Sequence, residues 1–99
     1  MSIKGDKVSE ITSTADDAYL AMQPASGEEW TIHNICYAGA AELYFYDGTN
    51  SILVGSAETA GGRLNCYLNC TYTHYYRLKN VSGGTAMLGY DGVVTKISV

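Results

Sequence analysis

The chain has 99 residues, 46% of them apolar, and a formal net charge of −4. This length supports one domain with one modest core and leaves little room for a recessed active-site cavity. The six basic residues are scattered along the chain, which argues against binding to nucleic acid or to an anionic membrane surface. No signal peptide or apolar span is visible, so we expect synthesis and retention in a cytoplasm.

The first 27 residues have the weakest pattern. Residues 7–12 predict a short edge strand, residues 15–22 a second strand or a loose turn, and residues 24–27 a loop. We therefore expect residues 1–27 to form a loosely packed N-terminal arm with the first edge strand or strands. Residues 28–99 are expected to form a β-sandwich core.

Alternation with a period of two begins at Glu28 and continues to the last residue. It predicts strands over residues 28–35, 42–46, 51–57, 63–70, 72–78, 85–90 and 93–99. Asp47-Gly48 and Asp91-Gly92 predict tight turns, and no helical period is present beyond Asp16. The pattern predicts an all-β fold, a single antiparallel β-sandwich or jelly-roll-like barrel of about seven or eight short strands.

The three cysteines do not suit a disulfide framework, because their number is odd. We expect free, buried thiols that pack as small apolar residues. Histidine and cysteine are zinc ligands, and the chain offers His33, Cys36, Cys66, Cys70 and His74. Extended strands, however, space such residues along a line and do not bring them together around one metal ion. We expect neither a metal nor another cofactor.

Catalytic groups are also not predicted. A thiol nucleophile needs a histidine beside it, and Cys66 and His74 become cross-strand neighbours only if a turn falls near Asn69. The adjacent carboxylates Asp16-Asp17 and Glu28-Glu29 point to opposite faces of a strand, which does not suit general acid–base catalysis. We therefore expect no enzymatic activity.

The nine tyrosines are the most informative polar feature. Tyr44 and Tyr46 alternate with Leu43 and Phe45, so they face outward if that apolar pair faces the core. Exposed aromatic residues mark protein–protein surfaces or sugar-stacking platforms, or simply cover the solvated face of a sheet. Protein contact is favoured over sugar binding. The candidate interface residues are Tyr44, Tyr46, Tyr75 and Arg77.

From Arg77 onward the sequence pattern predicts a strand, a glycine loop, a second strand, a turn and a final strand. Two segments carry this pattern: Arg77-Leu-Lys-Asn-Val-Ser-Gly-Gly84 and Gly89-Tyr-Asp-Gly-Val93. This style of sequence, over about residues 28–99, resembles small β-rich virion structural proteins of tailed phages. Such proteins include capsid decoration (cement) proteins, head fibres and small tail components. The resemblance implies a sandwich or jelly roll without catalytic residues.

The resemblance further implies a non-enzymatic capsid decoration protein that binds the outer surface of a phage head and stabilises it. An N-terminal arm would reach across a neighbouring capsid subunit. The partner would be the major capsid protein or another virion protein, and the chain itself a homo-oligomer, with a trimer favoured. It would be located in the virion after synthesis in the host cytoplasm. The alternative is a carbohydrate- or receptor-binding β-sandwich module of a phage tail or surface appendage.

Overall fold

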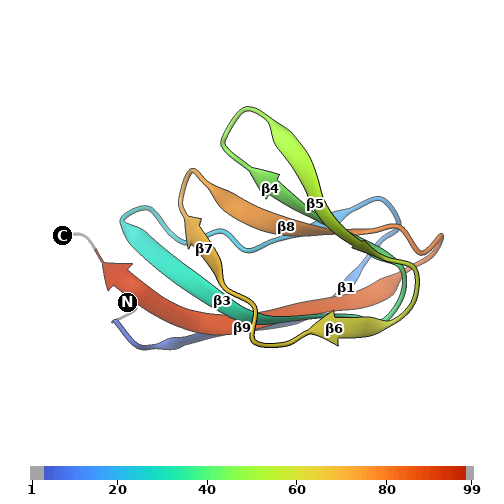
Figure 1. Ribbon diagram of the computed structural model, residues 1–99, viewed down its shortest axis with the longest axis horizontal. Helices are drawn as coiled ribbons and strands as arrows, with labels where there is room; N and C mark the ends of the chain where they lie inside the picture. The colour runs from blue at the N-terminus through green and yellow to red at the C-terminus, as the bar shows by residue number, and fades with distance from the viewer. Residues whose placement is uncertain (1–3, 98–99) are drawn as a thin grey trace.

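The computed structural model describes residues 4–97 as two antiparallel β-sheets packed face to face (Figure 1). Strands account for 62% of the structure and helices for none, which confirms the predicted all-β fold. The architecture is consistent with a β-sandwich. In this described part of the chain, no helix is long and apolar enough to cross a membrane.

The two sheets contain nine strands in the described residues. The first sheet has the order β1-β9-β3-β6, and β7 also pairs with β3. Its strands are β1 (Lys7–Thr14), β3 (Glu28–Tyr37), β6 (Gly61–Arg63), β7 (Leu68–Thr71) and β9 (Ala86–Ile97). The second sheet has the order β2-β8-β4-β5. Its strands are β2 (Tyr19–Ala21), β4 (Ala41–Tyr46), β5 (Ser51–Ala57) and β8 (Tyr75–Asn80).

The core lies between the sheets and follows the alternation of the sequence. Ala41 and Leu43 of β4 and Leu78 of β8 are buried from the second sheet. They meet Ile32 and Leu88, which are fully buried from the first sheet. Each large apolar side chain removed from water in this way stabilises the fold by about 1.5–3 kcal/mol. Every second residue of β4 and β8 consequently faces outward.

The N-terminal segment is more tightly packed than the sequence predicts. β1 and β2 are edge strands, as expected, but β1 pairs with β9 over its whole length. Leu20, Met22 and Pro24 are all buried. The prediction of a loosely packed arm is therefore wrong for residues 4–27, because these apolar side chains complete the core. Residues 1–3 lie outside the described part.

The predicted tight turn at Asp91-Gly92 is also wrong, because β9 continues through both residues. A Cβ atom on Gly92 would lie 2.7 Å from the Cα atom of Ile32. The register between β3 and β9 shifts at this point, between Ile32 and Asn34. Gly92 therefore allows close backbone contact at a β-bulge. Asp47-Gly48 does form the predicted turn, with Gly48 at a φ of 96°.

The predicted strand over residues 63–70 is divided into β6 and β7, both paired with β3. Between them Asn65 adopts a φ of 56°, a left-handed conformation that asparagine tolerates better than most residues. The backbone N–H of Cys66 donates to the carbonyl of His33 at 2.8 Å, so the connection stays close to β3. Leu64 and Tyr67 in this connection are each 75% exposed.

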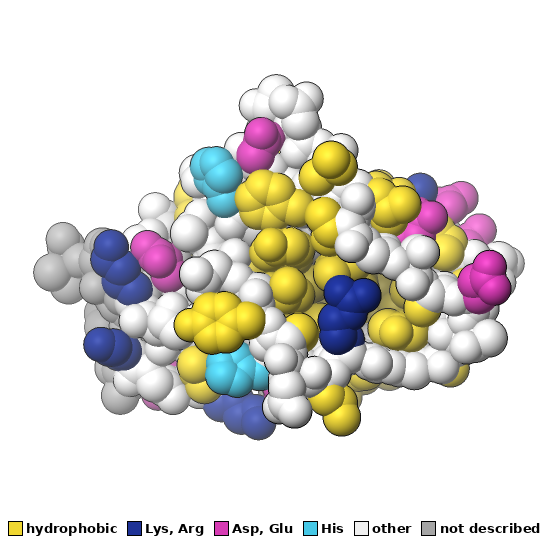
Figure 2. All heavy atoms as spheres, viewed as in Figure 1, with side chains coloured by type: hydrophobic (Ala, Val, Ile, Leu, Met, Phe, Trp, Pro, Cys, Tyr) yellow, Lys and Arg dark blue, Asp and Glu magenta, His cyan; other side chains and the backbone are white. Residues whose placement is uncertain are grey.

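One side of the sandwich, between β5 and β6, has a shallow apolar hollow. Its lining includes Ile35, Tyr37, Leu43 and Leu78, with Arg63 beside Gly55 at its edge. Hydrophobic side chains gather in the middle of the face that Figure 2 shows, between these two strands. The core is thus less completely covered along β5 than elsewhere on this face.

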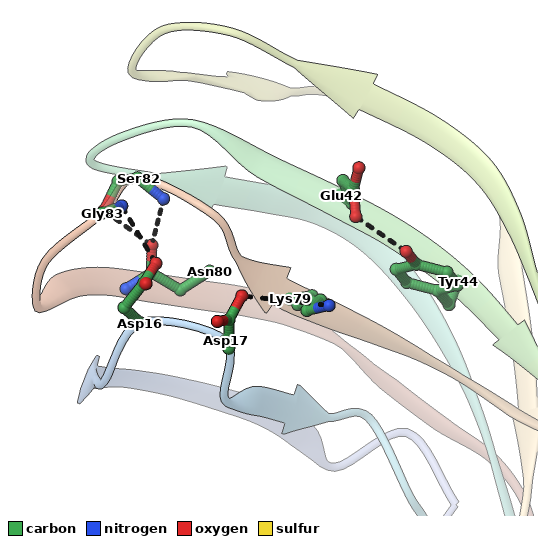
Figure 3. Close-up of polar contacts among 8 residues, drawn as sticks. All are labelled: Asp16, Asp17, Glu42, Tyr44, Lys79, Asn80, Ser82 and Gly83. Carbon is green, nitrogen blue, oxygen red and sulfur yellow. Dashed lines mark hydrogen bonds and ion pairs between the residues drawn. The ribbon is translucent and has the colours of Figure 1, made fainter.

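Asn80 is a polar junction within the core (Figure 3). Its side chain is fully buried, and its Nδ2 atom donates to the carbonyls of Thr14 and Gly84, both at 2.7 Å. Its Oδ1 atom accepts from the backbone N–H of Ser82 at 3.0 Å and from its hydroxyl at 2.7 Å. Asn80 thus ties the end of β8 to the end of β1 in the opposite sheet.

Replacing Asn80→Ala should lower the free energy of unfolding by about 2–4 kcal/mol, because it leaves buried backbone groups without partners. Urea denaturation followed by circular dichroism measures the change. Asn50→Ala is the matched control, because Asn50 is exposed, and it should change stability by less than about 0.5 kcal/mol. Equal losses in the two variants would contradict the assigned role of Asn80.

Candidate functional site

The four candidate interface residues lie together on the outer face of the second sheet. β4 and β8 are neighbouring strands, and their register places Tyr44 opposite Arg77 and Tyr46 opposite Tyr75. All four residues are partly buried, while the alternate residues Leu43 and Leu78 lie in the core. The outward orientation that the alternation predicts for Tyr44 and Tyr46 is therefore observed, and Tyr75 and Arg77 lie on the same face.

A fifth residue, Tyr19 of β2, joins them. β2 pairs with the other side of β8, with Tyr19 opposite Lys79. Tyr19 is 41% exposed, whereas the flanking alternate residues Leu20 and Met22 are buried. The period of two over residues 19–22 was the sequence signal for this outward tyrosine. We call the set Tyr19, Tyr44, Tyr46, Tyr75 and Arg77 the Tyr–Arg face.

The guanidinium group of Arg77 lies between two aromatic rings. Its Cζ atom is 4.2 Å from the ring centroid of Tyr19 and 4.5 Å from that of Tyr46. Each such cation–π contact contributes about 0.5–2 kcal/mol, depending on how far it is desolvated. Among residues 4–97, Arg77 has no ion pair, and its buried Nε atom has no hydrogen-bond partner.

The tyrosine rings also contact one another. Tyr46 and Tyr75 have centroids 5.4 Å apart at 58°, and Tyr19 and Tyr44 have centroids 5.9 Å apart at 71°. Inclined geometries of this kind are favoured between aromatic rings. The rings therefore pack against each other and against Arg77, which leaves less flat ring surface for a sugar to stack on.

Charged groups of both signs border the Tyr–Arg face (Figure 3). The phenol of Tyr44 donates to Oε1 of Glu42 at 2.7 Å, and this hydrogen bond raises the pKa of Tyr44 to about 12. Nζ of Lys79 lies 3.9 Å from Oδ1 of Asp17. Such exposed pairs add little stability. The arrangement is an aromatic centre with a polar rim, as in protein–protein interfaces.

The cysteines and histidines do not form an activated thiol pair. The thiol of Cys66 donates to the backbone carbonyl of His33 at 3.2 Å, and burial raises its pKa. His74 lies in the turn after β7, where its Nδ1 atom is 2.8 Å from the hydroxyl of Thr73. A nucleophilic thiol needs the opposite shift, a lowered pKa.

The three thiols are free, but they differ in burial: Cys70 is buried, Cys66 is partly buried and Cys36 is exposed. The prediction that all three are buried is thus wrong for Cys36. Within residues 4–97, no three His, Cys, Asp or Glu side chains are grouped so that they could hold a metal ion.

No protein-family model matches the chain, and a search of curated proteins finds no similar sequence.

Replacing Glu42→Ala should return the pKa of Tyr44 from about 12 toward its ordinary value of 10.0, because the carboxylate that stabilises the protonated phenol is removed. NMR titration of tyrosines labelled at the ring Cζ carbon measures this shift. Tyr90 should keep its pKa of about 12, which burial raises first and Glu10 second. Glu58→Gln is the control. An unchanged Tyr44 titration in Glu42→Ala would contradict the assigned hydrogen bond.

The thiols should react in the order of their exposure. Cys36 is expected to be alkylated rapidly in the native protein at about pH 8, whereas Cys70 should react only after unfolding, because burial raises its pKa to about 11. Mass spectrometry of peptides after timed alkylation measures the three rates. The Cys36→Ser variant should lose the fast phase. A fast phase that persists in this variant would contradict the assignment.

Proposed function

We propose that this chain is a non-enzymatic binding protein that contacts another protein through the Tyr–Arg face. The supporting observation is Arg77, held between Tyr19 and Tyr46 without a carboxylate partner among the described residues. Tyrosine and arginine are enriched among the residues that dominate binding energy at protein interfaces. A side chain already ordered by its neighbours loses little conformational freedom when it binds.

The chemistry of the Tyr–Arg face favours a partner that presents a carboxylate within an apolar surface. The outer part of the guanidinium would form a charge-assisted pair with that carboxylate, while the tyrosine rings would exclude water around it. Glu42 and Lys79 at the rim would select the orientation of the partner by charge.

More specifically, we propose that the partner is a virion protein. In this proposal the chain binds the outer surface of a phage head and stabilises it. This part is supported by the resemblance of residues 77–84 and 89–93 to small phage structural proteins. Several copies in a symmetric assembly would bind through many weak contacts at once, so that individual contacts could remain modest. The major capsid protein is the favoured partner.

A carbohydrate- or receptor-binding role in a phage tail is the second candidate. The exposure of Tyr19 and the presence of three further tyrosines on the same face support it. The inclined rings and the position of Arg77 over Tyr19 and Tyr46 favour protein contact instead. A glycan array separates the two candidates.

Arg77→Ala should weaken binding to virions from the source of the gene by at least about tenfold, because arginine is enriched among the few interface residues whose truncation costs about 2 kcal/mol or more. Co-sedimentation of the labelled protein with virions that lack it measures the affinity.

The matched pair of variants is Tyr46→Ser on the Tyr–Arg face and Tyr72→Ser, which replaces a tyrosine that is 50% exposed outside this face. Only Tyr46→Ser should lower binding. No binding of the wild-type protein to virions, together with specific glycan binding, would replace the virion proposal by the carbohydrate one. Virion binding unaffected by both Arg77→Ala and Tyr46→Ser would contradict the assignment of the face.

A further inference from the structure

The shallow hollow between β5 and β6 is bordered by small residues of β5. They are Gly55, Ser56 and Ala57, whose side chains are too short to close the gap between the two sheets. The hollow has a volume of about 220 Å³, its open mouth included, which is less than the roughly 300–1,000 Å³ of sites for drug-sized ligands. It therefore has room for a small molecule only.

The floor of this hollow is apolar. Ile35 of β3, Leu43 of β4 and Leu78 of β8 all border it, and all three belong to the core between the sheets. Figure 2 shows the same face, with hydrophobic side chains gathered in its middle. An apolar group placed against this floor would be removed from water, which is the main source of affinity in sites of this kind.

Two hydrogen-bond donors border the hollow from the first sheet. Arg63 of β6 lies opposite Ile35, and the next residue of β3 on that face is Tyr37. The guanidinium lies against Gly55, where a Cβ atom would be only 2.9 Å from its Nη2 atom. Among residues 4–97, neither the guanidinium of Arg63 nor the phenol of Tyr37 has an ion pair or a hydrogen bond. Both donors are thus available to an acceptor from outside the chain.

We propose that this hollow binds a small carboxylic acid with a short apolar chain. The planar guanidinium of Arg63 would hold the carboxylate through two parallel hydrogen bonds, and the phenol of Tyr37 would donate a third. The apolar chain would lie over Leu43 and Leu78. Two donors without an acceptor, beside an apolar floor, select a ligand that is anionic at one end and apolar at the other.

Glu42 also borders the hollow, but its carboxylate is engaged elsewhere. It accepts a hydrogen bond from Tyr44, and residue 42 lies opposite Lys79 in the pairing of β4 with β8. This is the outer face of the second sheet. The acid group of the ligand therefore meets Arg63 and not Glu42.

The acid site is separate from the proposed partner surface. Leu43 and Leu78 face the core, whereas the Tyr–Arg face lies on the opposite side of the same sheet. Arg77→Ala should therefore leave acid binding unchanged even if it abolishes binding to the protein partner, so that either proposal can fail without the other.

Titration of the ¹⁵N-labelled protein with hexanoate, followed by NMR, tests the proposal. Hexanoate should cause saturable shifts in the amide signals of residues 35–37, 55–57 and 63 and in the Nε–H signal of Arg63. A ligand of about eight non-hydrogen atoms is expected to bind with a dissociation constant on the order of 1 mM. Acetate and 1-hexanol each lack one half of the ligand and should bind at least about tenfold more weakly.

Variants separate the two parts of the site. Arg63→Gln should raise the dissociation constant for hexanoate about tenfold, at the lower end for charged hydrogen bonds because Arg63 is exposed. Tyr37→Phe should raise it about threefold. Ala57→Leu fills the hollow from β5 and should remove the saturable shifts. Lys96→Gln is the matched control, because it removes one positive charge outside the hollow and should change nothing.

Unchanged signals from β1 and β9 would verify that each variant is folded. Three results would each overturn the proposal: no saturable shift at ten times the expected dissociation constant, equal hexanoate affinity in the wild type and Arg63→Gln, or 1-hexanol binding as tightly as hexanoate. Shifts centred on Tyr19, Tyr46 and Arg77 would do the same, because they would place carboxylate binding on the Tyr–Arg face alone.

Discussion

The pairing of β3 with β9 positions the rest of the sandwich. These two strands pair from Glu28 opposite Ile97 to Tyr37 opposite Leu88, and each carries further strands on its other side. Their contact requires a residue without a side chain at Gly92, because a Cβ atom there would lie 2.7 Å from the Cα atom of Ile32. Ile32 and Leu88 from this pair are fully buried and pack against the second sheet. Any substitution that separated β3 from β9 would therefore displace both sheets.

The second sheet uses its two faces differently. Its inner face closes the core, whereas its outer face holds Arg77 among tyrosine rings that already contact one another. Order of this kind lowers the entropy cost of association, because side chains are in place before a partner arrives. Tyr44 lies opposite Leu53 of β5, so the Tyr–Arg face borders the exposed apolar residues of this edge strand.

Local patterns predicted the strands and the direction of most side chains, because the period of two is visible wherever one face is buried. Tyr44 and Tyr46 were assigned to an outer face on this basis, and Tyr75 and Arg77 lie on the same face. Their proximity, and the addition of Tyr19, depended on the strand order β2-β8-β4, which no local pattern encodes. Asp91-Gly92 was misread because glycine serves both turns and close backbone contacts, and only the facing bulge in β3 distinguishes the two. The sequence predicted β5 as a strand but not its position at the edge of the sheet, because that position is a tertiary property.

The pairing of β1 with β9 has a consequence for how the molecule forms. Lys7 lies opposite Val93, so the first strand of the described residues pairs with the last one, far away in the sequence. During synthesis β1 and β3 leave the ribosome before their pairing partner β9. Closing such a long loop costs conformational entropy before any stabilising contact forms. Folds dominated by strand pairs distant in sequence therefore form slowly. The nascent chain therefore exposes unpaired strand edges until β9 has been synthesised, and chaperones and neighbouring chains compete for it during this period.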